Sequence, residues 1–193
     1  MPTFKRGFTL IELMIVVAVI AIVASIAVPN MVRSKMAANE VACLGSCKAY
    51  AEAQEIYHRS DWDGDGVLEY ATALRGDVSL FELTSGSGDI QLVDKSIAVA
   101  EGDPTASTPK GGYVFRVLTG QGANVSGGSK SYLSGANLLG GYGLSAIPQS
   151  YDSTGRNSFQ IGQVGLIYQK DRGLADTWHL TAYNPDTTWT NAE

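Results

Sequence analysis

The residues best suited to bind a metal ion form a short acidic cluster about one third of the way along the chain. Asp61, Asp63 and Asp65 alternate with other residues, and Gly66 follows the third aspartate. This spacing matches the first half of an EF-hand calcium loop, in which carboxylates supply oxygen ligands and the glycine permits a sharp turn. A threonine stands at the twelfth position, where such a loop needs a glutamate, so Glu69, or Asp77 further on, would have to complete the shell. The pattern predicts a structural Ca2+ site, with a metal-free Asp/Gly-rich turn as the alternative.

A second residue whose chemistry suggests a function is Glu12, which is the single charged residue between Phe8 and Val32. A carboxylate inside an apolar helix is costly unless it faces a positive partner or takes up a proton. Cleavage of the chain after Gly7 would create a positively charged amine at Phe8, close to this carboxylate. The alternative is a glutamate that reaches the membrane interface or stays protonated, without a partner.

The element that positions Glu12 is an apolar run, residues 8–28, which ends at Pro29. As a helix its 21 residues would span roughly 31 Å, at about 1.5 Å each, and the hydrocarbon core of a bilayer is about 30 Å thick. We therefore expect a membrane-spanning helix. A secretory signal peptide is the alternative, although the run is longer than the usual apolar region of such a peptide. Lys5 and Arg6 precede the run and favour a cytoplasmic N-terminus.

The stretch from Lys5 to Glu12 resembles the processing site of type IV prepilins, which the pseudopilins of type II secretion share. The resemblance implies that a membrane-bound prepilin peptidase and methyltransferase cleaves the chain after Gly7 and methylates the new N-terminus at Phe8. It implies that Glu12 pairs with the amine of a neighbouring, identical subunit while inner-membrane machinery assembles a helical filament. It also implies that Pro29 bends or locally loosens the helix.

The helical pattern continues from residue 30 to about residue 57 but changes character. Met36, Cys43, Tyr50 and Tyr57 recur every seven residues, which is typical of one apolar face of a helix. We expect this face to pack on a globular head, with a weak two-stranded coiled coil as the alternative.

Cys43 and Cys47 lie four residues apart on this predicted helix, with Gly45 between them. Helical side chains at this spacing place their Cβ atoms about 5–6 Å apart, whereas a disulfide needs about 3.5–4.5 Å. We therefore expect two small core-facing thiols, with a bridge that distorts the helix as the alternative.

The remainder of the chain reads as short strands. Gly162 and Gly165 frame a tight turn between the last two of them, and the Gly-rich residues 120–143 read as a flexible insertion or a hairpin tip. Regular short strands with tight turns predict an antiparallel sheet, with strands at 111–119, 142–147, 158–161 and 166–169.

This half also resembles the C-terminal half of pilins, at Tyr113 and Phe115, Ala146 and Pro148, and Gly155, Arg156, Phe159, Gly165, Ile167 and Tyr168. The C-terminal disulfide loop that is frequent in that family is absent, because no cysteine follows Cys47. Packing and hydrogen bonds would have to hold that region.

These elements predict an α+β fold in which a long N-terminal helix packs on an antiparallel β-sheet head, as in type IV pilins. The expected divisions are a prepilin leader at 1–7, a transmembrane and filament-core helix at 8–29, an amphipathic helix half at 30–59, and a globular head at 60–193 with its acidic loop at 61–70.

Composition narrows the function. The chain has 193 residues, 19 acidic against 14 basic side chains and a net charge of −5, which argues against a nucleic-acid-binding module. No nucleophile–base order, phosphate loop or metal-hydrolase signature stands out, so we expect neither an enzyme nor a small-molecule substrate. The first hypothesis is a structural pilin of a type IV pilus, serving adhesion, motility or DNA uptake. The alternatives are the major pseudopilin of a type II secretion system and a membrane-anchored binding protein. The pilin hypothesis places the chain as a single-pass protein of the inner membrane, N-terminus cytoplasmic, and after assembly in an extracellular pilus; a pseudopilus would be periplasmic.

Overall fold

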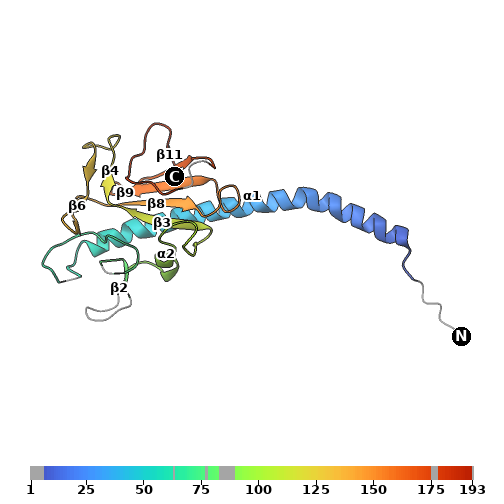
Figure 1. The fold of residues 1–193 in the computed structure, drawn as a ribbon, viewed down its shortest axis with the longest axis horizontal. Helices are drawn as coiled ribbons and strands as arrows, with labels where there is room; N and C mark the ends of the chain where they lie inside the picture. Colours follow the sequence, from blue (N-terminus) through green and yellow to red (C-terminus); the bar gives the residue numbers. More distant parts are fainter. Residues whose placement is uncertain (1–6, 63, 77, 83–89, 175–177, 193) are drawn as a thin grey trace. The chain divides into compact units, whose positions relative to one another are not determined.

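The computed structural model describes residues 7–192 except 63, 77, 83–89 and 175–177. The chain divides into two compact units, residues 1–35 and 36–193. The N-terminal unit is helical, and the second unit combines the rest of that helix with the β-sheet head (Figure 1). The predicted α+β fold, a long N-terminal helix followed by an antiparallel sheet, is confirmed.

One helix, α1 (Leu10–Tyr57), accounts for both predicted helical segments and continues through Pro29 over 48 residues. Its side chains up to Lys35 are exposed in the described part of the chain. From Met36 onward the helix has a buried face, and the predicted seven-residue stripe forms that face. Its buried residues are Met36, Cys43, Ser46, Cys47, Tyr50, Ala53, Gln54 and Tyr57.

The head is organised around a five-stranded antiparallel sheet whose order is β11-β10-β9-β8-β3. Its strands are β3 (Tyr113–Leu118), β8 (Gly143–Pro148), β9 (Asn157–Gly162), β10 (Ile167–Asp171) and β11 (Thr190–Asn191). The strands β3, β8, β9 and β10 lie where the sequence predicts them. A hydrogen bond from the Gly165 N–H to the Gly162 carbonyl, at 2.9 Å, closes the predicted tight turn between β9 and β10.

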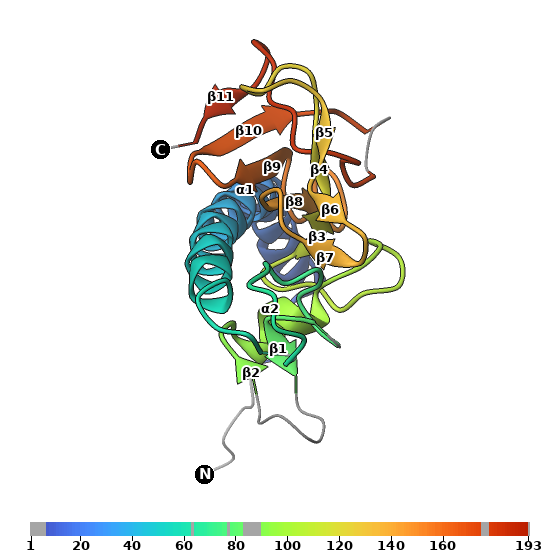
Figure 2. The same ribbon diagram turned by 90° about the vertical axis from the view of Figure 1, so that its left-hand side faces the viewer.

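The pairing register separates the two faces of the sheet. Phe115 lies opposite Ala146, and Ala146 opposite Phe159, so these three side chains share the inner face. They belong to one apolar core with the buried stripe of α1, including Tyr50. The rings of Tyr50 and Tyr142 pack edge to face, with their centroids 5.8 Å apart. The second half of α1 and the sheet therefore form two layers around one core (Figure 2).

Smaller elements fill the edges of the head. They are β1 (Phe81–Glu82) paired with β2 (Ile90–Gln91), α2 (Lys95–Val99), β4 (Gly120–Gln121) paired with β5 (Lys130–Ser131), and β6 (Leu133–Ser134) paired with β7 (Asn137–Leu138). The Gly-rich insertion thus forms two short β-ribbons. It is anchored because Tyr132 and Leu138 are buried in the core and the Tyr132 hydroxyl donates to Gln121 Oε1 at 3.1 Å.

Candidate functional site

The predicted processing region lies directly before the first turn of α1. Gly7 and Phe8 are exposed and precede the helix, so the peptide bond between them lies outside regular secondary structure. The side chain of Phe8 is 87% exposed. Lys5 and Arg6 lie outside the described residues. The bond predicted to be cleaved is therefore sterically accessible in this structure.

Glu12 is held at the start of the helix by Thr9, a residue that the sequence reasoning did not single out. The backbone N–H and the hydroxyl of Thr9 both donate to Glu12 Oε2, at 2.9 and 2.7 Å, and the Glu12 N–H lies 3.3 Å from Thr9 Oγ1. This is a capping box, in which the residue before the helix and the third helical residue satisfy each other's polar groups. Its signal, Thr-x-x-Glu before an apolar run, is readable in the sequence. The carboxylate therefore points back toward Phe8.

The apolar run that carries Glu12 is exposed in the part of the chain that the structure describes. The most hydrophobic 18-residue window of α1 is 0% buried, and the helix is long and apolar enough to cross a membrane by length and composition. Leu10 and Ile22, for example, are 75% and 64% exposed. An uninterrupted apolar surface of this kind marks a membrane or protein interaction site.

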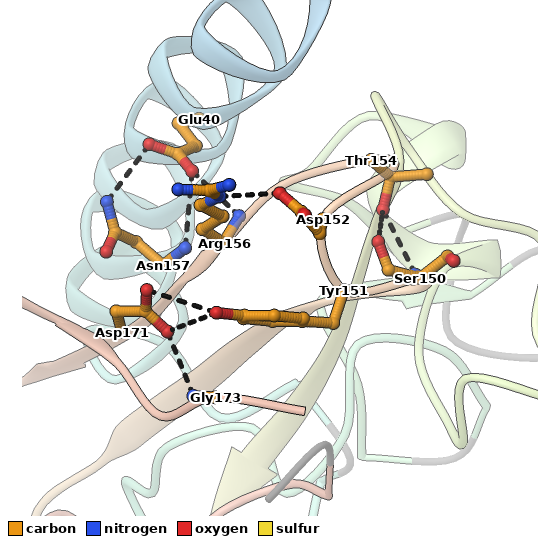
Figure 3. A network of polar contacts seen from close by, with 9 residues as sticks. All are labelled: Glu40, Ser150, Tyr151, Asp152, Thr154, Arg156, Asn157, Asp171 and Gly173. Atoms are coloured by element: carbon orange, nitrogen blue, oxygen red, sulfur yellow. Dashed lines mark hydrogen bonds and ion pairs between the residues drawn. The ribbon is translucent and has the colours of Figure 1, made fainter. Parts of the chain in front are cut away.

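A second polar cluster joins α1 to the loop between β8 and β9 (Figure 3). Glu40 Oε1 accepts hydrogen bonds from the backbone N–H groups of Arg156 and Asn157 at 2.9 and 3.2 Å, and Glu40 Oε2 accepts one from Asn157 Nδ2 at 3.1 Å. The preceding residue, Asn39, donates from Nδ2 to the Thr154 carbonyl at 2.7 Å. Glu40 interrupts the apolar stripe of the sequence because it binds this loop.

The loop itself is closed by its own polar contacts. The Arg156 guanidinium donates to Asp152 Oδ1 at 2.6 Å, and Asp152 has a positive φ of 60°, which is unusual for a residue with a side chain. At the other end of the cluster the Tyr151 hydroxyl donates to the Asp171 carboxylate at 3.0 Å (Figure 3). The loop is thus fixed both to α1 and to β10.

The acidic loop is folded around its first aspartate. Asp61 accepts the N–H of Gly64 at 2.8 Å and of Gly66 at 2.9 Å, and both glycines have positive φ angles, 77° and 83°. Such angles favour glycine, which explains the residue type at these turns. The two carboxylate oxygens of Asp61 therefore turn inward, toward the loop backbone.

The other predicted ligands are less closely gathered. Asp65 accepts the Val67 N–H at 2.7 Å and Asn137 Nδ2 at 2.8 Å, and Glu69 is buried. Asp63 and the alternative ligand Asp77 lie outside the described residues. Among the residues that the structure describes, no three His, Cys, Asp or Glu side chains form a group that could hold a metal ion. The calcium site thus stays a prediction that depends on Asp63.

The two cysteines are both free and buried, as predicted. They are 2% and 0% exposed, and burial raises the pKa of the Cys43 thiol well above its usual value. A thiol that is protonated and out of reach of solvent is a poor nucleophile and a poor metal ligand. These residues serve the core.

The chain also contains a serine–histidine contact, between Ser145 Oγ and His179 Nδ1 at 3.2 Å. Ser145 is 0% exposed and lies in the middle of β8, so its hydroxyl cannot meet a substrate from solvent. The contact is therefore structural.

Comparisons with known proteins agree with this arrangement. A family model described as "Prokaryotic N-terminal methylation motif" matches residues 3–28, which include Gly7, Phe8 and Glu12. The type IV major pilin protein PilA of Myxococcus xanthus is 36% identical over 90 residues, 46% of this chain and 41% of the relative. The type IV wide pilus major component PilA4 of Thermus thermophilus is 40% identical over 52 residues, 27% of this chain and 40% of the relative.

The type II secretion system core protein G of Escherichia coli is 36% identical over 53 residues, which is 28% of this chain and 37% of that protein. The chain thus spans about two fifths of the length of the curated relatives that it matches. No solved structure matches it.

The methylation motif at the start of a long apolar helix, followed by an antiparallel head, defines a subunit of the type IV pilin and pseudopilin class. Within this class the chain belongs to the family described as "Protein of unknown function (DUF2950)", whose model matches residues 24–192.

Proposed function

We propose that this protein is a structural subunit of a type IV pilus. It is inserted in the inner membrane, cleaved after Gly7 and polymerised through the apolar part of α1 into a surface filament. The observation that carries the proposal is the exposed apolar surface of α1, which begins three residues after the predicted cleavage site. A bilayer covers this surface before assembly, and the helices of neighbouring subunits cover it in the filament.

Glu12 favours the move of the helix from the bilayer into the filament. In the capping box its carboxylate receives two hydrogen bonds from Thr9, but neither donor is charged, so the negative charge stays uncompensated in apolar surroundings. The α-amine that cleavage creates at Phe8 is positive at neutral pH. The amine of a neighbouring subunit can neutralise Glu12 when the two helices lie side by side, and such pairing favours assembly over dispersal in the membrane.

The pilus is favoured over the pseudopilus by the extent of the matches. The longest match, 90 residues, is to a major pilin, whereas the match to the secretion protein covers 53 residues. The major pseudopilin of a type II secretion system is the alternative function, because the methylation motif and the apolar helix serve both kinds of filament.

Calcium is a separate proposal. We propose that loop 61–70 binds one structural Ca2+ ion through Asp61, Asp63, Asp65 and Glu69. Support comes from the alternating aspartates and from the inward-turned carboxylate of Asp61, which accepts backbone N–H groups from Gly64 and Gly66. A bound ion would reduce the repulsion among neighbouring carboxylates.

The filament proposal is tested on cells that produce the wild-type chain, Glu12→Leu or the matched control Glu52→Leu, which removes an exposed glutamate from the other half of α1. Shearing should release the wild-type and Glu52→Leu subunits from the cell surface as filaments, but not Glu12→Leu. If the wild-type chain stays in the cell envelope, and deletion of its gene blocks protein secretion, the pseudopilus is correct. Equal filament yields for all three chains would contradict the role given to Glu12.

A further inference from the structure

The segment that precedes β11, residues 178–189, crosses the outer face of the sheet and forms a C-terminal strap. Ser145 and Gln160 lie opposite each other on β8 and β9 and share this outer face. The strap binds both of them. The Leu180 N–H donates to Ser145 Oγ at 3.3 Å, and the Asn184 N–H donates to Gln160 Oε1 at 2.9 Å. Ser145 and Gln160 are both 0% exposed because the strap covers them.

No covalent bond holds the strap, since the chain has no cysteine after Cys47. Its attachment depends on hydrogen bonds and on the packing of its buried Tyr183 and Trp189, as the sequence predicts for the C-terminal region. Most of the hydrogen bonds between the strap and this face involve neutral groups, whose charge does not change with pH. One strap residue is different: His179 can change its charge within the range of environmental pH.

His179 is buried, at 6% exposure, and is bonded on both sides. Its Nε2 lies 2.9 Å from the Gly102 carbonyl, and its Nδ1 lies 3.2 Å from Ser145 Oγ. A carbonyl can only accept a hydrogen bond, which assigns the proton to Nε2. Nδ1 is then free to accept the Ser145 hydroxyl proton, so the observed geometry is that of a neutral imidazole.

The surroundings oppose protonation of this ring. Burial lowers the pKa of His179 to about 4, and the positive charges of Arg116 on β3 and Arg172 after β10 act in the same direction. The Gly102 carbonyl and the carboxylate of Asp103 favour the charged form but do not outweigh burial. Arg116 and Asp103 also pair with each other at 2.5 Å. A proton on Nδ1 would in addition displace the Ser145 hydroxyl hydrogen from its acceptor.

We propose that the C-terminal strap is an acid-sensitive cover of the outer sheet face, closed while His179 is neutral and opened when His179 takes up a proton. The helix α1 and the inner face of the sheet do not take part, because their shared core lies on the opposite side of the sheet. The strap is part of the head, so its proposed opening does not depend on whether the chain assembles into a pilus or a pseudopilus.

The size of the effect follows from linkage. In the open strap His179 regains its ordinary pKa of 6.5, whereas the closed strap holds it at about 4. The open state therefore binds more protons between these values, and acid favours opening. Between pH 7 and pH 5 the ratio of open to closed strap should rise roughly 20-fold. Above pH 7 it should change little.

The test is hydrogen exchange of the full-length protein in detergent micelles at pH 7 and pH 5, with each amide corrected for its intrinsic exchange rate. The protection of the Leu180 and Asn184 amides should fall roughly 20-fold at pH 5. The amide of Phe115 on β3, which donates to the Ala100 carbonyl at 2.9 Å, should keep its protection.

Two variants complete the test. His179→Gln keeps a neutral side chain that can both donate and accept, so its strap protection should be the same at both pH values. His58→Gln removes the other histidine of the chain and should retain the wild-type fall in strap protection. The proposal is overturned if strap protection in the wild-type protein does not change with pH, if β3 loses protection together with the strap, or if His179→Gln shows the same fall. Should His179→Gln fail to fold, the wild-type comparison of strap and β3 decides alone.

Discussion

Replacement of Gln54 by leucine should destabilise the head, because it removes the hydrogen-bond partner of two buried backbone groups. Gln54 is 0% exposed on the buried face of α1. Its Oε1 accepts the Ala71 N–H at 2.9 Å, and its Nε2 donates to the Ala71 carbonyl and to the Tyr50 hydroxyl, both at 2.9 Å. The side-chain amide thus takes the place of a neighbouring strand for the backbone of Ala71. Leucine has a similar volume but no polar atoms, so it would leave both backbone groups of Ala71 without this partner.

The expected magnitude follows from that loss. A buried backbone donor or acceptor without a partner costs about 1–3 kcal/mol, and two of them are affected here, which gives about 2–6 kcal/mol of unfolding free energy. For a domain of this size each kcal/mol lowers Tm by about 2–4 °C, so Gln54→Leu should lower Tm by roughly 4–24 °C.

Thermal unfolding of the purified protein, followed by near-UV circular dichroism of its buried tyrosines, measures this shift. Tyr50→Phe is the matched control. It removes the hydroxyl that donates to the Gly143 carbonyl at 2.9 Å and accepts from Gln54 Nε2, but it leaves both Ala71 contacts in place, and it should cost about 1–2 kcal/mol. If Gln54→Leu costs no more than Tyr50→Phe, the Ala71 contacts do not carry the stability that we assign to them.

Three further predictions concern the other parts of the head. Glu40→Gln should lower the free energy of unfolding, measured by denaturant titration, by about 1–2 kcal/mol, because the neutral amide accepts hydrogen bonds from the loop N–H groups less strongly. The control Glu52→Gln should leave the free energy of unfolding unchanged. Equal effects of the two substitutions would refute the role of the loop contact. Cys43 and Cys47 should resist a maleimide reagent in the native protein and react in denaturant, and rapid native labelling of either thiol would show that the helix face is not packed as described. EGTA should lower the thermal midpoint if loop 61–70 binds Ca2+, and added Ca2+ should restore it; an unchanged midpoint would remove the calcium proposal.

Local periodicity explains which parts of the fold are predictable from the sequence. Met36, Cys43, Tyr50 and Tyr57 repeat with the period of a helix that has one buried face, and all four are buried. The strand at Tyr113–Leu118 and the turn after Gly162 are equally local signals. Each of these three patterns can be recognised from residues that are close together in the sequence.

The contacts that the sequence did not reveal are long-range and polar. Glu40 reads as a flaw in the apolar stripe until the Arg156 and Asn157 amides, more than a hundred residues later, provide its partners. His179 reads as an isolated histidine because Ser145 and Gly102 reach it from separate strands and loops. The Gly-rich insertion is ordered by burial of Tyr132, which its composition does not signal. Thr9 was the exception, since its capping box with Glu12 is a local pattern.

The most direct test of the central claim is mass analysis of the N-terminal peptide of the protein isolated from sheared cell-surface material. Assembly through a processed apolar helix predicts a peptide that begins at Phe8, with one methyl group on its amine, and no peptide that contains Lys5 or Arg6. A surface protein that retains residues 1–7, or that begins at any residue other than Phe8, would contradict the account.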